Sequence, residues 1–326
     1  MTARISTPQI VPGTRIAGLG HYRPSKVVTN DDLAQIIDTN DDWIRSRVGI
    51  AERRYSEEGE TVSSMGALAG RAALDDAGMT AADIDTVITA TCTLEAQIPH
   101  ASTRIAAALG IHAPGSFDVN GACAGFCYGM AVASQAIRTG NARNVLLVGS
   151  EQLTHWVDPK DRANSIIFAD GAGAAVVTAA ETEQIGPIAW GSDETLTETI
   201  YIADRDSFVY QEGQSVFRWA TTAIAPVAIR AVQQAGLALS DIDVFVSHQA
   251  NLRIVDAIAK KLVSAGARSD MRVARDIITT GNTSSASIPI ALDRMRKAGE
   301  VSSGDLVLAI GFGAGLTYAG QVFVCP

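Results

Sequence analysis

The chain has 326 residues, 47% of them hydrophobic, which is enough to bury a large core in one big domain or two closely associated ones. Its formal net charge of −9 argues against nucleic-acid binding, which needs a basic stripe. No apolar run approaches the roughly 18 residues of a membrane span, and the first 15 residues show no apolar signal segment. Four cysteines form no disulfide framework and favour a reducing, cytoplasmic location.

Short apolar segments alternate with amphipathic segments along the chain, and this alternation predicts an α/β protein. We expect strands at 87–92, 116–119, 144–149, 173–179, 244–248, 306–311 and 319–324. We expect helices at 61–77, 101–109, 123–139, 216–235, 251–264 and 284–298. A polar, turn-rich segment at 179–198 divides these elements, so we predict an N-terminal half, 1–180, and a C-terminal half, 181–326.

Two stretches of the chain resemble each other. Residues 72–88 align with residues 230–246 without a gap, and both contain an Ala-Gly pair and the tripeptide Asp-Ile-Asp. Each stretch predicts a helix that ends at a glycine, a short loop and a buried strand. Chance similarity is the alternative to duplication, but the helix and strand that follow also recur in the same order. A duplication makes the starts of helices 123–139 and 284–298 equivalent, so both can approach one site.

Cys123 lies in "ACAGF" (122–126), between an expected strand and an expected helix. The positive end of a helix stabilises a thiolate, and free N–H groups at a helix start can bind an oxyanion. Small neighbours leave room for a thioester, so we interpret Cys123 as a nucleophile rather than a buried structural cysteine. Cys127 lies one turn inside the helix and is interpreted as a packing residue. A metal pair is not favoured, because two ligands four residues apart have no second pair.

Polar residues follow two further elements. His248 ends an apolar strand in "HQANLRI" (248–254), where active-site groups of α/β proteins collect, although a single histidine is often structural. Asn282, in "GNTSSAS" (281–287), reads locally as a turn or cap residue. Only the duplication argument relates Asn282 to the loop that carries Cys123.

Two glycine-rich segments suggest a nucleotide-binding site, but neither is followed by the helix that such a site requires. Both "GFGAG" (311–315) and "DGAGAAVV" (170–177) lead into strand-like sequence, whereas a dinucleotide fingerprint must open a helix. We expect both to be tight turns with exposed backbone amides, one of which can donate to an oxyanion.

Taken together, "ACAGF", "DGAGAAVV", "HQANLRI", "GNTSSAS" and "GFGAG" resemble, in order and spacing, the beta-ketoacyl-ACP synthase III family of the thiolase fold. The segments 38–50 ("DTNDDWIRSRVGI") and 158–162 ("DPKDR") also resemble motifs of that family. The resemblance runs from about residue 14 to the C-terminus. It implies a five-layered αβαβα fold of two duplicated halves, usually a homodimer, with no metal or other cofactor.

The resemblance also implies a mechanism. Cys123 accepts an acyl group from acyl-CoA, and the Cys123 and Ala314 amides hold the oxyanion. Malonyl-ACP then loses CO2, His248 and Asn282 stabilise the enolate, and the carbanion attacks the Cys123 acyl group. An amide at residue 282 suits this role because a carboxylate would repel an enolate.

Further contacts carry over from the family. Trp43 matches the residue that stacks on adenine. The other matched CoA contacts are Thr39, Arg47, Arg162, Gly213, Phe217, Ala250 and Asn251. Arg253, with Lys260 and Lys261 on the same expected helix, forms a candidate docking patch for an acidic acyl carrier protein, or else an ordinary solvated face.

The sequence departs from the family at three places. The segment at 190–213 is several residues shorter, Ile98 stands where some members have an aromatic lid residue, and Ser285 replaces a common alanine. These differences leave the acyl group open, so the priming of fatty acid synthesis and the priming of a polyketide both stay possible. A cysteine acyl-hydrolase is a third hypothesis, since "GACAG" fits a nucleophile elbow, but no acid is marked as the partner of His248.

Overall fold

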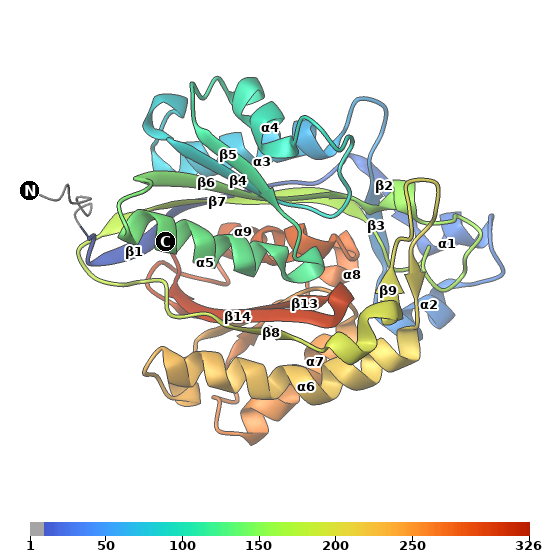
Figure 1. Cartoon of the computed structure of the whole chain (residues 1–326). Coiled ribbons are helices and arrows are strands. Elements are labelled where there is room, and N and C mark those ends of the chain that lie inside the picture. The colour runs from blue at the N-terminus through green and yellow to red at the C-terminus, as the bar shows by residue number, and fades with distance from the viewer. Residues whose placement is uncertain (1–9) are drawn as a thin grey trace, which may run out of the picture.

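The computed structural model describes residues 10–326, which form two five-stranded sheets of identical topology (Figure 1). The first sheet has the order β5-β4-β6-β7-β1, and the second has the order β12-β11-β13-β14-β8. In each sheet the first three strands are parallel and the last two pair antiparallel. The strands are β1 (Gly13–Tyr22), β4 (Thr86–Ala90), β5 (Gly115–Val119), β6 (Asn144–Gln152), β7 (Asp170–Ala180), β8 (Ala189–Ser192), β11 (Val244–Ser247), β12 (Arg272–Val273), β13 (Leu306–Gly313) and β14 (Thr317–Val324).

Helices form the other three layers of a five-layered αβαβα arrangement (Figure 1). The outer layer of the first half has α3 (Val62–Ala77) and α4 (Ala101–Leu109), and that of the second half has α6 (Gly213–Gln234) and α7 (Leu252–Ser264). The central layer has α5 (Gly125–Arg138) and α9 (Ser287–Lys297), which lie between the sheets. The five layers agree with the fold expected from the sequence.

Smaller elements surround one end of the sheets. They are two hairpin-like pairs, β2 (Lys26–Thr29) with β3 (Glu52–Tyr55) and β9 (Ile200–Tyr201) with β10 (Tyr210–Gln211), and the short helices α1 (Asn30–Ala34), α2 (Asp41–Val48) and α8 (Ile277–Thr280). Short 3-10 turns are η1 (Ala81–Asp83), η2 (Ala122–Ala124), η3 (Leu153–Trp156), η4 (Glu194–Thr199), η5 (Leu239–Asp241), η6 (Ser284–Ala286) and η7 (Ala314–Leu316).

The repeated stretches have the same local structure. Gly78 (φ 64°) follows α3 and Gly236 (φ 74°) lies just past α6, and a 3-10 turn and a strand come after each glycine. A left-handed φ at such a position favours glycine, which has no Cβ to clash. The predicted sequence of helix, glycine, loop and strand is therefore confirmed in both stretches.

The central layer is the core that connects the two sheets. Met130 and Ile137 of α5 are buried with Ile288 and Leu292 of α9 in one hydrophobic cluster. The packing is close because glycines replace larger residues where helices meet strands. A Cβ at Gly173 of β7 would lie 2.7 Å from the Pro289 side chain.

One prediction about turns is wrong. The segment 170–177 ("DGAGAAVV") lies wholly within β7 and is buried, not in a tight turn. Its glycines and alanines give α9 room to approach the sheet, as the contact distance at Gly173 shows. The segment 311–315 does turn, because β13 ends at Gly313 and η7 follows.

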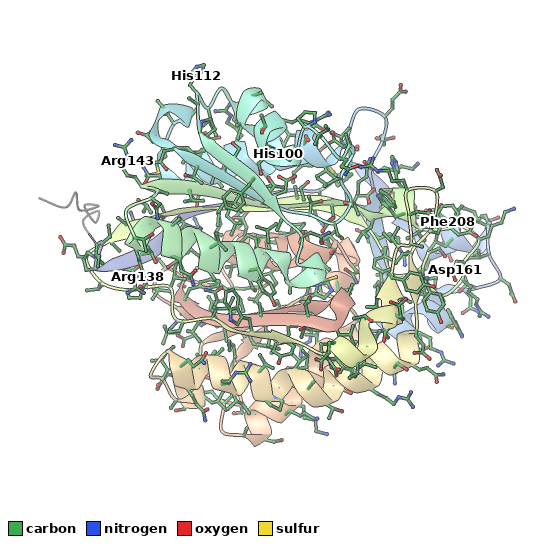
Figure 2. All side chains as sticks on the ribbon, in the orientation of Figure 1. His100, His112, Arg138, Arg143, Asp161 and Phe208 are labelled. Carbon is green, nitrogen blue, oxygen red and sulfur yellow. The ribbon has the colours of Figure 1, made fainter. Side chains whose placement is uncertain are left out.

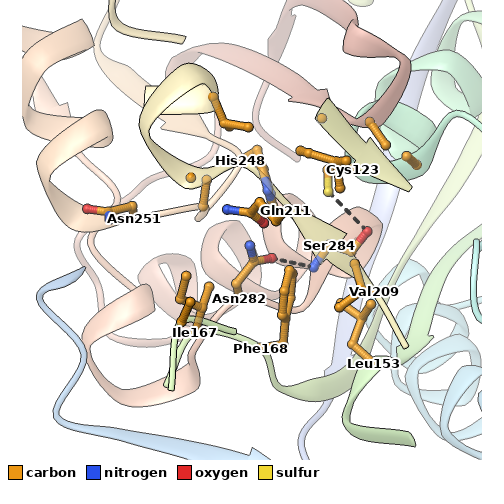
Figure 3. A pocket seen from close by; sticks show the side chains of 18 of the residues that line it. Cys123, Leu153, Ile167, Phe168, Val209, Gln211, His248, Asn251, Asn282 and Ser284 are labelled. Carbon is orange, nitrogen blue, oxygen red and sulfur yellow. Dashed lines mark hydrogen bonds between the residues drawn. The ribbon is translucent and has the colours of Figure 1, made fainter. Parts of the chain in front are cut away.

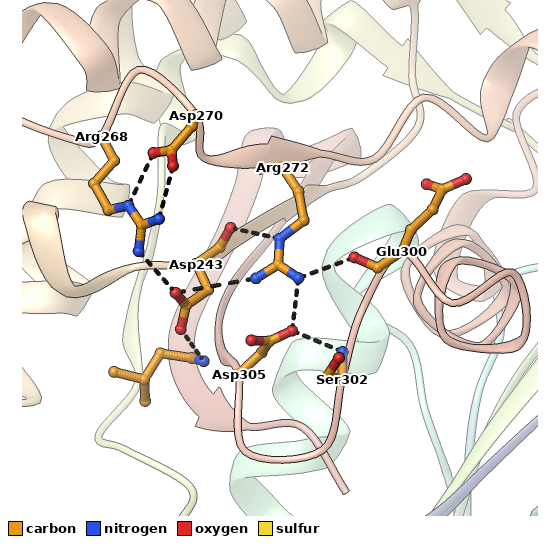
Figure 4. Close-up of polar contacts among 8 residues, drawn as sticks. Asp243, Arg268, Asp270, Arg272, Glu300, Ser302 and Asp305 are labelled. Carbon is orange, nitrogen blue, oxygen red and sulfur yellow. Dashed lines mark hydrogen bonds and ion pairs between the residues drawn. The ribbon is translucent and has the colours of Figure 1, made fainter.

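A polar cluster joins three loops at one end of the second sheet (Figure 4). Arg272 donates to a carboxylate oxygen of Asp305 at 2.8 Å and to the carbonyl of Glu300 at 3.0 Å. Arg268 pairs with Asp270 at 2.8 Å and with Asp243 at 3.1 Å. These contacts fix the starts of β11, β12 and β13 relative to one another.

Between residues 10 and 326, no helix combines the length and the apolar character needed to cross a bilayer. The expectation of no secretory segment concerns residues that include 1–9, which lie outside the described residues. All strands of the first sheet fall within 13–180 and those of the second within 189–324. The division of the chain between 180 and 181 stays a prediction.

Candidate active site

A cavity of about 950 Å³ opens where the two halves meet, and residues of both halves line it. Four predicted site residues, Cys123, His248, Asn282 and Ala314, line this one cavity although they are far apart in sequence. Figure 3 shows the three polar side chains directed into the same space from different segments. The structure thus brings together the residues expected to carry the chemistry.

Cys123 lies in η2, between β5 and α5, as the sequence predicts for a residue at a helix start. Ala122, just before it, has a left-handed φ of 44°, which turns the chain sharply so that the thiol faces the cavity. Gly313 packs directly on Cys123, because a Cβ there would lie 2.8 Å from the sulfur. The nucleophile is therefore held between a strained turn and a glycine.

Burial controls the acidity of this thiol. It raises the pKa of Cys123 to about 12, while the Ser284 hydroxyl acts in the opposite direction by hydrogen bonding to the sulfur. We expected the helix start to stabilise a thiolate, but desolvation outweighs the local donors. Cys123 is therefore a protonated thiol at neutral pH in the free enzyme and needs a proton acceptor when it reacts.

Ser284 connects the two helix starts. It has a left-handed φ of 49° and begins η6, just before α9. Its Oγ donates to the Cys123 Sγ at 3.3 Å, and its backbone N–H donates to Asn282 Oδ1 at 2.8 Å (Figure 3). The prediction that the loops before the two matching helices approach one site is confirmed.

His248 follows the C-terminal end of β11 and is 2% exposed. Its Nδ1 lies 2.8 Å from the Ser287 Oγ, which also accepts the Gln249 backbone N–H at 3.2 Å. Burial lowers the pKa of His248 to about 3, so the ring is neutral at physiological pH. The Phe312 ring meets it edge to face, with 5.4 Å between the ring centroids. The ring also interacts with the Ser284 backbone, which raises its pKa and partly offsets the effect of burial.

Asn282 is 5% exposed and is fixed by its carbonyl oxygen. Because Oδ1 accepts the Ser284 N–H, the amide orientation is set and Nδ2 is the group left to donate. No residue in 10–326 accepts a hydrogen bond from this Nδ2. A neutral imidazole and a primary amide therefore stand near the thiol as candidate donors.

Several of the expected CoA contacts lie on the apolar and aromatic side of the cavity. Arg162 lies over the Trp43 ring at 3.9 Å and Arg47 lies 5.6 Å from the same ring. Arg253 lies 5.1 Å from the Phe217 ring. The predicted contacts that line the cavity are Trp43, Arg47, Gly213, Phe217, Ala250 and Asn251.

Some predicted residues lie beside the cavity and do not line it. Arg162 contacts the cavity only through the Trp43 ring. Thr39 is half-buried, and its hydroxyl has no hydrogen-bond partner within the described part of the chain.

The candidate docking patch lies on α7. Lys260 and Lys261 are exposed there, and the Lys261 ammonium donates to the Thr221 carbonyl at 2.5 Å. Arg253, two turns earlier, lies at the cavity rim. Their assignment to CoA or carrier-protein binding stays a prediction.

The three places where the sequence differs from the family lie at different distances from the cavity. The short segment supplies Ile200, Ile202 and Val209 to the cavity wall, so it shapes the apolar part of the site. Ile98 is 84% exposed and lies outside the cavity. Ser285 is buried, and its Oγ lies 2.7 Å from a Glu151 carboxylate oxygen.

Sequence reasoning did not single out Ser287, Cys92 or Glu151 as site residues. Ser287 holds the His248 ring, and Cys92 lines the cavity just after β4. Glu151 lies in β6 and is fully buried. A carboxylate two residues past the apolar run 145–149 was the available signal, because a buried carboxylate is costly unless it has hydrogen-bond partners or a role.

No other histidine reaches the cavity in the described part of the chain. Figure 2 shows His112 pointing outward beyond α4, at the far side of the first half. In 10–326 no group of three or more His, Cys, Asp or Glu side chains is placed to hold a metal ion.

Comparison with known proteins identifies the family. The model of 3-oxoacyl-(acyl-carrier-protein) synthase III matches residues 117–194, and the model of its C-terminal domain matches residues 232–325. Beta-ketoacyl-(acyl-carrier-protein) synthase III 2 of Streptomyces avermitilis is 45% identical over 317 residues, covering 96% of this chain and 99% of the relative. The chain belongs to the 3-oxoacyl-(acyl-carrier-protein) synthase III family. It is an acyl-transferring condensing enzyme with the thiolase-like fold.

Other members of the synthase III family are similarly close. The mycobacterial beta-ketoacyl-(acyl-carrier-protein) synthase III of Mycobacterium avium is 45% identical, covering 95% of each chain. The solved priming beta-ketosynthase of a polyketide pathway superposes with a TM-score of 0.94 at 40% identity, covering 99% of this chain and 98% of that one. The solved 3-oxoacyl-(acyl-carrier-protein) synthase III of Aquifex aeolicus superposes with a TM-score of 0.91 at 36% sequence identity, covering 96% of this chain and 100% of that one.

Proposed function

We propose that this enzyme transfers an acyl group from acyl-CoA to Cys123 and then condenses it with malonyl-ACP to give 3-ketoacyl-ACP. The observation that carries the proposal is the convergence of Cys123, His248 and Asn282 on one cavity in a chain of this family. The reaction starts fatty acid synthesis and uses no metal or other cofactor. We also propose that it takes place in the cytoplasm.

The first half-reaction is acyl transfer. The Cys123 sulfur attacks the thioester carbonyl, and the Cys123 and Ala314 amides bind the oxyanion that forms. Gly313 supports this assignment, because only a residue without a Cβ lets the η7 turn lie against the sulfur. CoA occupies the open side of the cavity near Trp43, Arg47 and Arg162. The acyl chain lies against the apolar wall.

The second half-reaction is decarboxylative condensation. We assign the Ser287 hydroxyl, which accepts the Gln249 N–H, as the donor to His248 Nδ1. The neutral ring then carries its proton on Nε2. That N–H and Asn282 Nδ2 donate to the malonyl thioester oxygen and stabilise the enolate left by CO2. The carbanion attacks the Cys123 thioester, and a carbon–carbon bond forms as the sulfur leaves.

A cysteine hydrolase fits this site less well. The His248 Nδ1 has a serine hydroxyl as its partner, whereas a hydrolytic triad places a carboxylate or an asparagine amide there. A hydrolase also gives the Asn282 amide no task. A priming role in a polyketide pathway is the second candidate, because the 0.94 TM-score neighbour primes such a pathway. The two differ in starter group and not in mechanism.

We further propose a homodimer that docks an acyl carrier protein through Arg253, Lys260 and Lys261. The edge strand β5 exposes Phe117 (40%), and the nearby Ile98 is 84% exposed. An unpaired edge with apolar side chains supports pairing with a second copy.

The test has two stages. The enzyme is incubated with acetyl-, propionyl-, isobutyryl- and longer acyl-CoAs, and its intact mass is measured. Malonyl-ACP is then added, and CO2 and product are followed. We expect an acyl adduct on Cys123, absent in Cys123→Ala, and CO2 release coupled to ketoacyl-ACP. Release of free acid without condensation would instead support the hydrolase. Absence of any adduct would end the proposal, and the best-loaded CoA distinguishes acetyl priming from a specialised starter.

A further inference from the structure

A buried carboxylate lies behind the nucleophile and is connected to it by exchangeable protons. The Cys123 Sγ lies 3.3 Å from Ser284 Oγ, which lies 3.8 Å from Cys92 Sγ. Cys92 Sγ in turn lies 3.5 Å and 3.6 Å from the two Glu151 carboxylate oxygens. The chain therefore runs from sulfur to hydroxyl to sulfur to carboxylate, across four different segments.

The Glu151 carboxylate can accept a proton, and no cationic side chain is paired with it within residues 10–326. It is fully buried and forms no ion pair with any residue in 10–326. Neutral donors surround it instead: Thr93 Oγ1 at 2.6 Å, Ser285 Oγ at 2.7 Å and the Cys92 N–H at 3.1 Å. Isolating a carboxylate in this way is costly unless it has a role or is fully hydrogen-bonded. Burial raises its pKa, which brings its affinity for protons closer to that of a thiol.

His248 is poorly suited to accept the Cys123 proton. Burial lowers its pKa to about 3, and the proposed condensation needs a proton on Nε2 before malonyl-ACP arrives. The thiol itself is protonated, since burial raises its pKa to about 12. The acylation step therefore needs an acceptor other than the imidazole.

We propose that Ser284, Cys92 and Glu151 form a proton relay that accepts the Cys123 thiol proton when Cys123 attacks acyl-CoA. The inference rests on the proposed acyl transfer to Cys123. Ser284 touches the reacting sulfur, and Cys92 and Glu151 act through Ser284.

The relay balances protons and electrons without an added reactant. In the free enzyme the Ser284 hydroxyl donates to the Cys123 sulfur, so the relay begins when this hydroxyl turns its proton toward Cys92 Sγ. The Cys123 proton then moves to Ser284 Oγ, the Ser284 proton moves to Cys92 Sγ, and the Cys92 proton moves to the Glu151 carboxylate. The Cys123 sulfur forms a bond to the acyl carbon as the bond from that carbon to the CoA sulfur breaks. The leaving CoA thiolate takes a proton from Ser284, and Cys92 and Glu151 restore it in turn. The enzyme returns to its starting protonation state as the acyl-enzyme.

The central test changes Cys92. Cys92→Val fills the space without an exchangeable proton, and Cys92→Ser keeps one. We expect the rate of Cys123 acylation at pH 7, followed by rapid quench and intact mass, to fall about 100-fold in Cys92→Val, the size of a general-base contribution. Cys92→Ser should recover most of the rate. Cys325→Ser, a buried cysteine outside the cavity, is the matched control and should load like the wild type.

The pH profile separates a relay from a packing role. As pH rises, more of the Cys123 thiol ionises without the relay. The acylation rate of Cys92→Val should therefore approach that of the wild type as the pH is raised. The titratable groups that face Glu151 are Cys92 and Cys123, and the η6 turn offers it only serine hydroxyls. Glu151→Gln should show the same pH-dependent deficit, and Glu183→Gln, which alters a hydrogen-bonded glutamate far from the cavity, should not.

The outcomes are distinguishable. If the wild type does not load any acyl-CoA, the proposed function fails. If the wild type loads and Cys92→Val matches its rate and profile, the relay is overturned. A deficit that stays constant with pH, or that Cys92→Ser does not recover, also overturns it. If Glu151→Gln does not fold, the acylation rates of Cys92→Val and Cys92→Ser still test the relay.

Discussion

Ala122 and Ser284 share an unusual backbone conformation at matching points of the two halves. Their φ angles are 44° and 49°, and each begins a 3-10 turn that leads into a helix of the central layer. A left-handed φ costs a residue with a side chain about 1–2 kcal/mol. The two turns meet at the hydrogen bond between Ser284 and Cys123, so the strain lies where the nucleophile is positioned.

The strain at Ala122 predicts different effects for two substitutions. Ala122→Val adds a branched side chain at a left-handed φ, so we expect the free energy of unfolding to fall by about 1–2 kcal/mol and acyl loading to slow. Ala122→Gly removes the Cβ but adds chain entropy to the unfolded state, so its stability should stay within about 1 kcal/mol of the wild type. Urea denaturation and intact-mass loading measure both. Equal stability of the Val and Gly variants would contradict strain at this turn.

Gly313 should be intolerant of a single methyl group. A Cβ there would lie 2.7 Å from the Cys123 Cβ and 2.8 Å from its sulfur, so Gly313→Ala must displace the nucleophile or the η7 turn. We expect acyl loading to fall by at least about 100-fold, because small displacements of reacting atoms cost that much.

The matched control for this substitution is Gly115→Ala. Its nearest contact would be an ordinary 3.7 Å, at the hydroxyl of Thr86. Loading of this variant should stay near that of the wild type, and circular dichroism should show both variants folded. If Gly313→Ala loads as quickly as Gly115→Ala, the turn is not constrained by the nucleophile.

Local sequence patterns were sufficient to predict the parallel strands and the long helices. The strands at 144–149 and 306–311 are apolar runs between turn signals, and β6 and β13 contain them. The first strand, β1, was missed because its glycines and alternating polar residues weaken the pattern. In 170–177 the glycines suggested turns, but they serve the approach of α9 to β7, a tertiary contact that no local pattern contains.

The site was predictable only where a motif gave a reason to choose a residue. Cys123, His248 and Asn282 stood in motifs, and the duplication explained why the loops of Cys123 and Asn282 meet. Cys92 and Glu151 stand alone in sequence. Ser284 of the other half connects Cys92 to Cys123, and Ser285 contacts Glu151. The acidity of Cys123 was also unpredictable, because burial raises its pKa more than the local hydrogen bonds lower it.

His248 should remain neutral throughout the pH range in which the enzyme is stable. Its pKa is lowered to about 3 by burial, so protonation is lost well below pH 5 and the ring does not titrate between pH 5 and 8. The decarboxylation rate of the acylated enzyme should therefore show no inflection near the ordinary histidine pKa of about 6.5.

Nuclear magnetic resonance of enzyme labelled with ¹⁵N-histidine tests this directly. The His248 signals should keep the chemical shifts of a neutral ring from pH 5 to 8. A His248 transition between pH 5 and 8 would show that the ring is solvated, and the assignment of a neutral donor would be wrong.

Asn282→Asp should separate the two half-reactions. Aspartate keeps the oxygen that accepts the Ser284 N–H, so the turn and the Cys123 contact should persist and acyl loading should stay within a few fold of the wild type. It replaces the Nδ2 donor with an oxygen that repels an enolate, so decarboxylative condensation should fall about 100- to 1,000-fold, as for the loss of an oxyanion donor. Intact mass measures loading, and CO2 release from malonyl-ACP measures condensation in the same preparation. An equal fall in both rates would mean that Asn282 supports the fold of the site and does not bind the enolate.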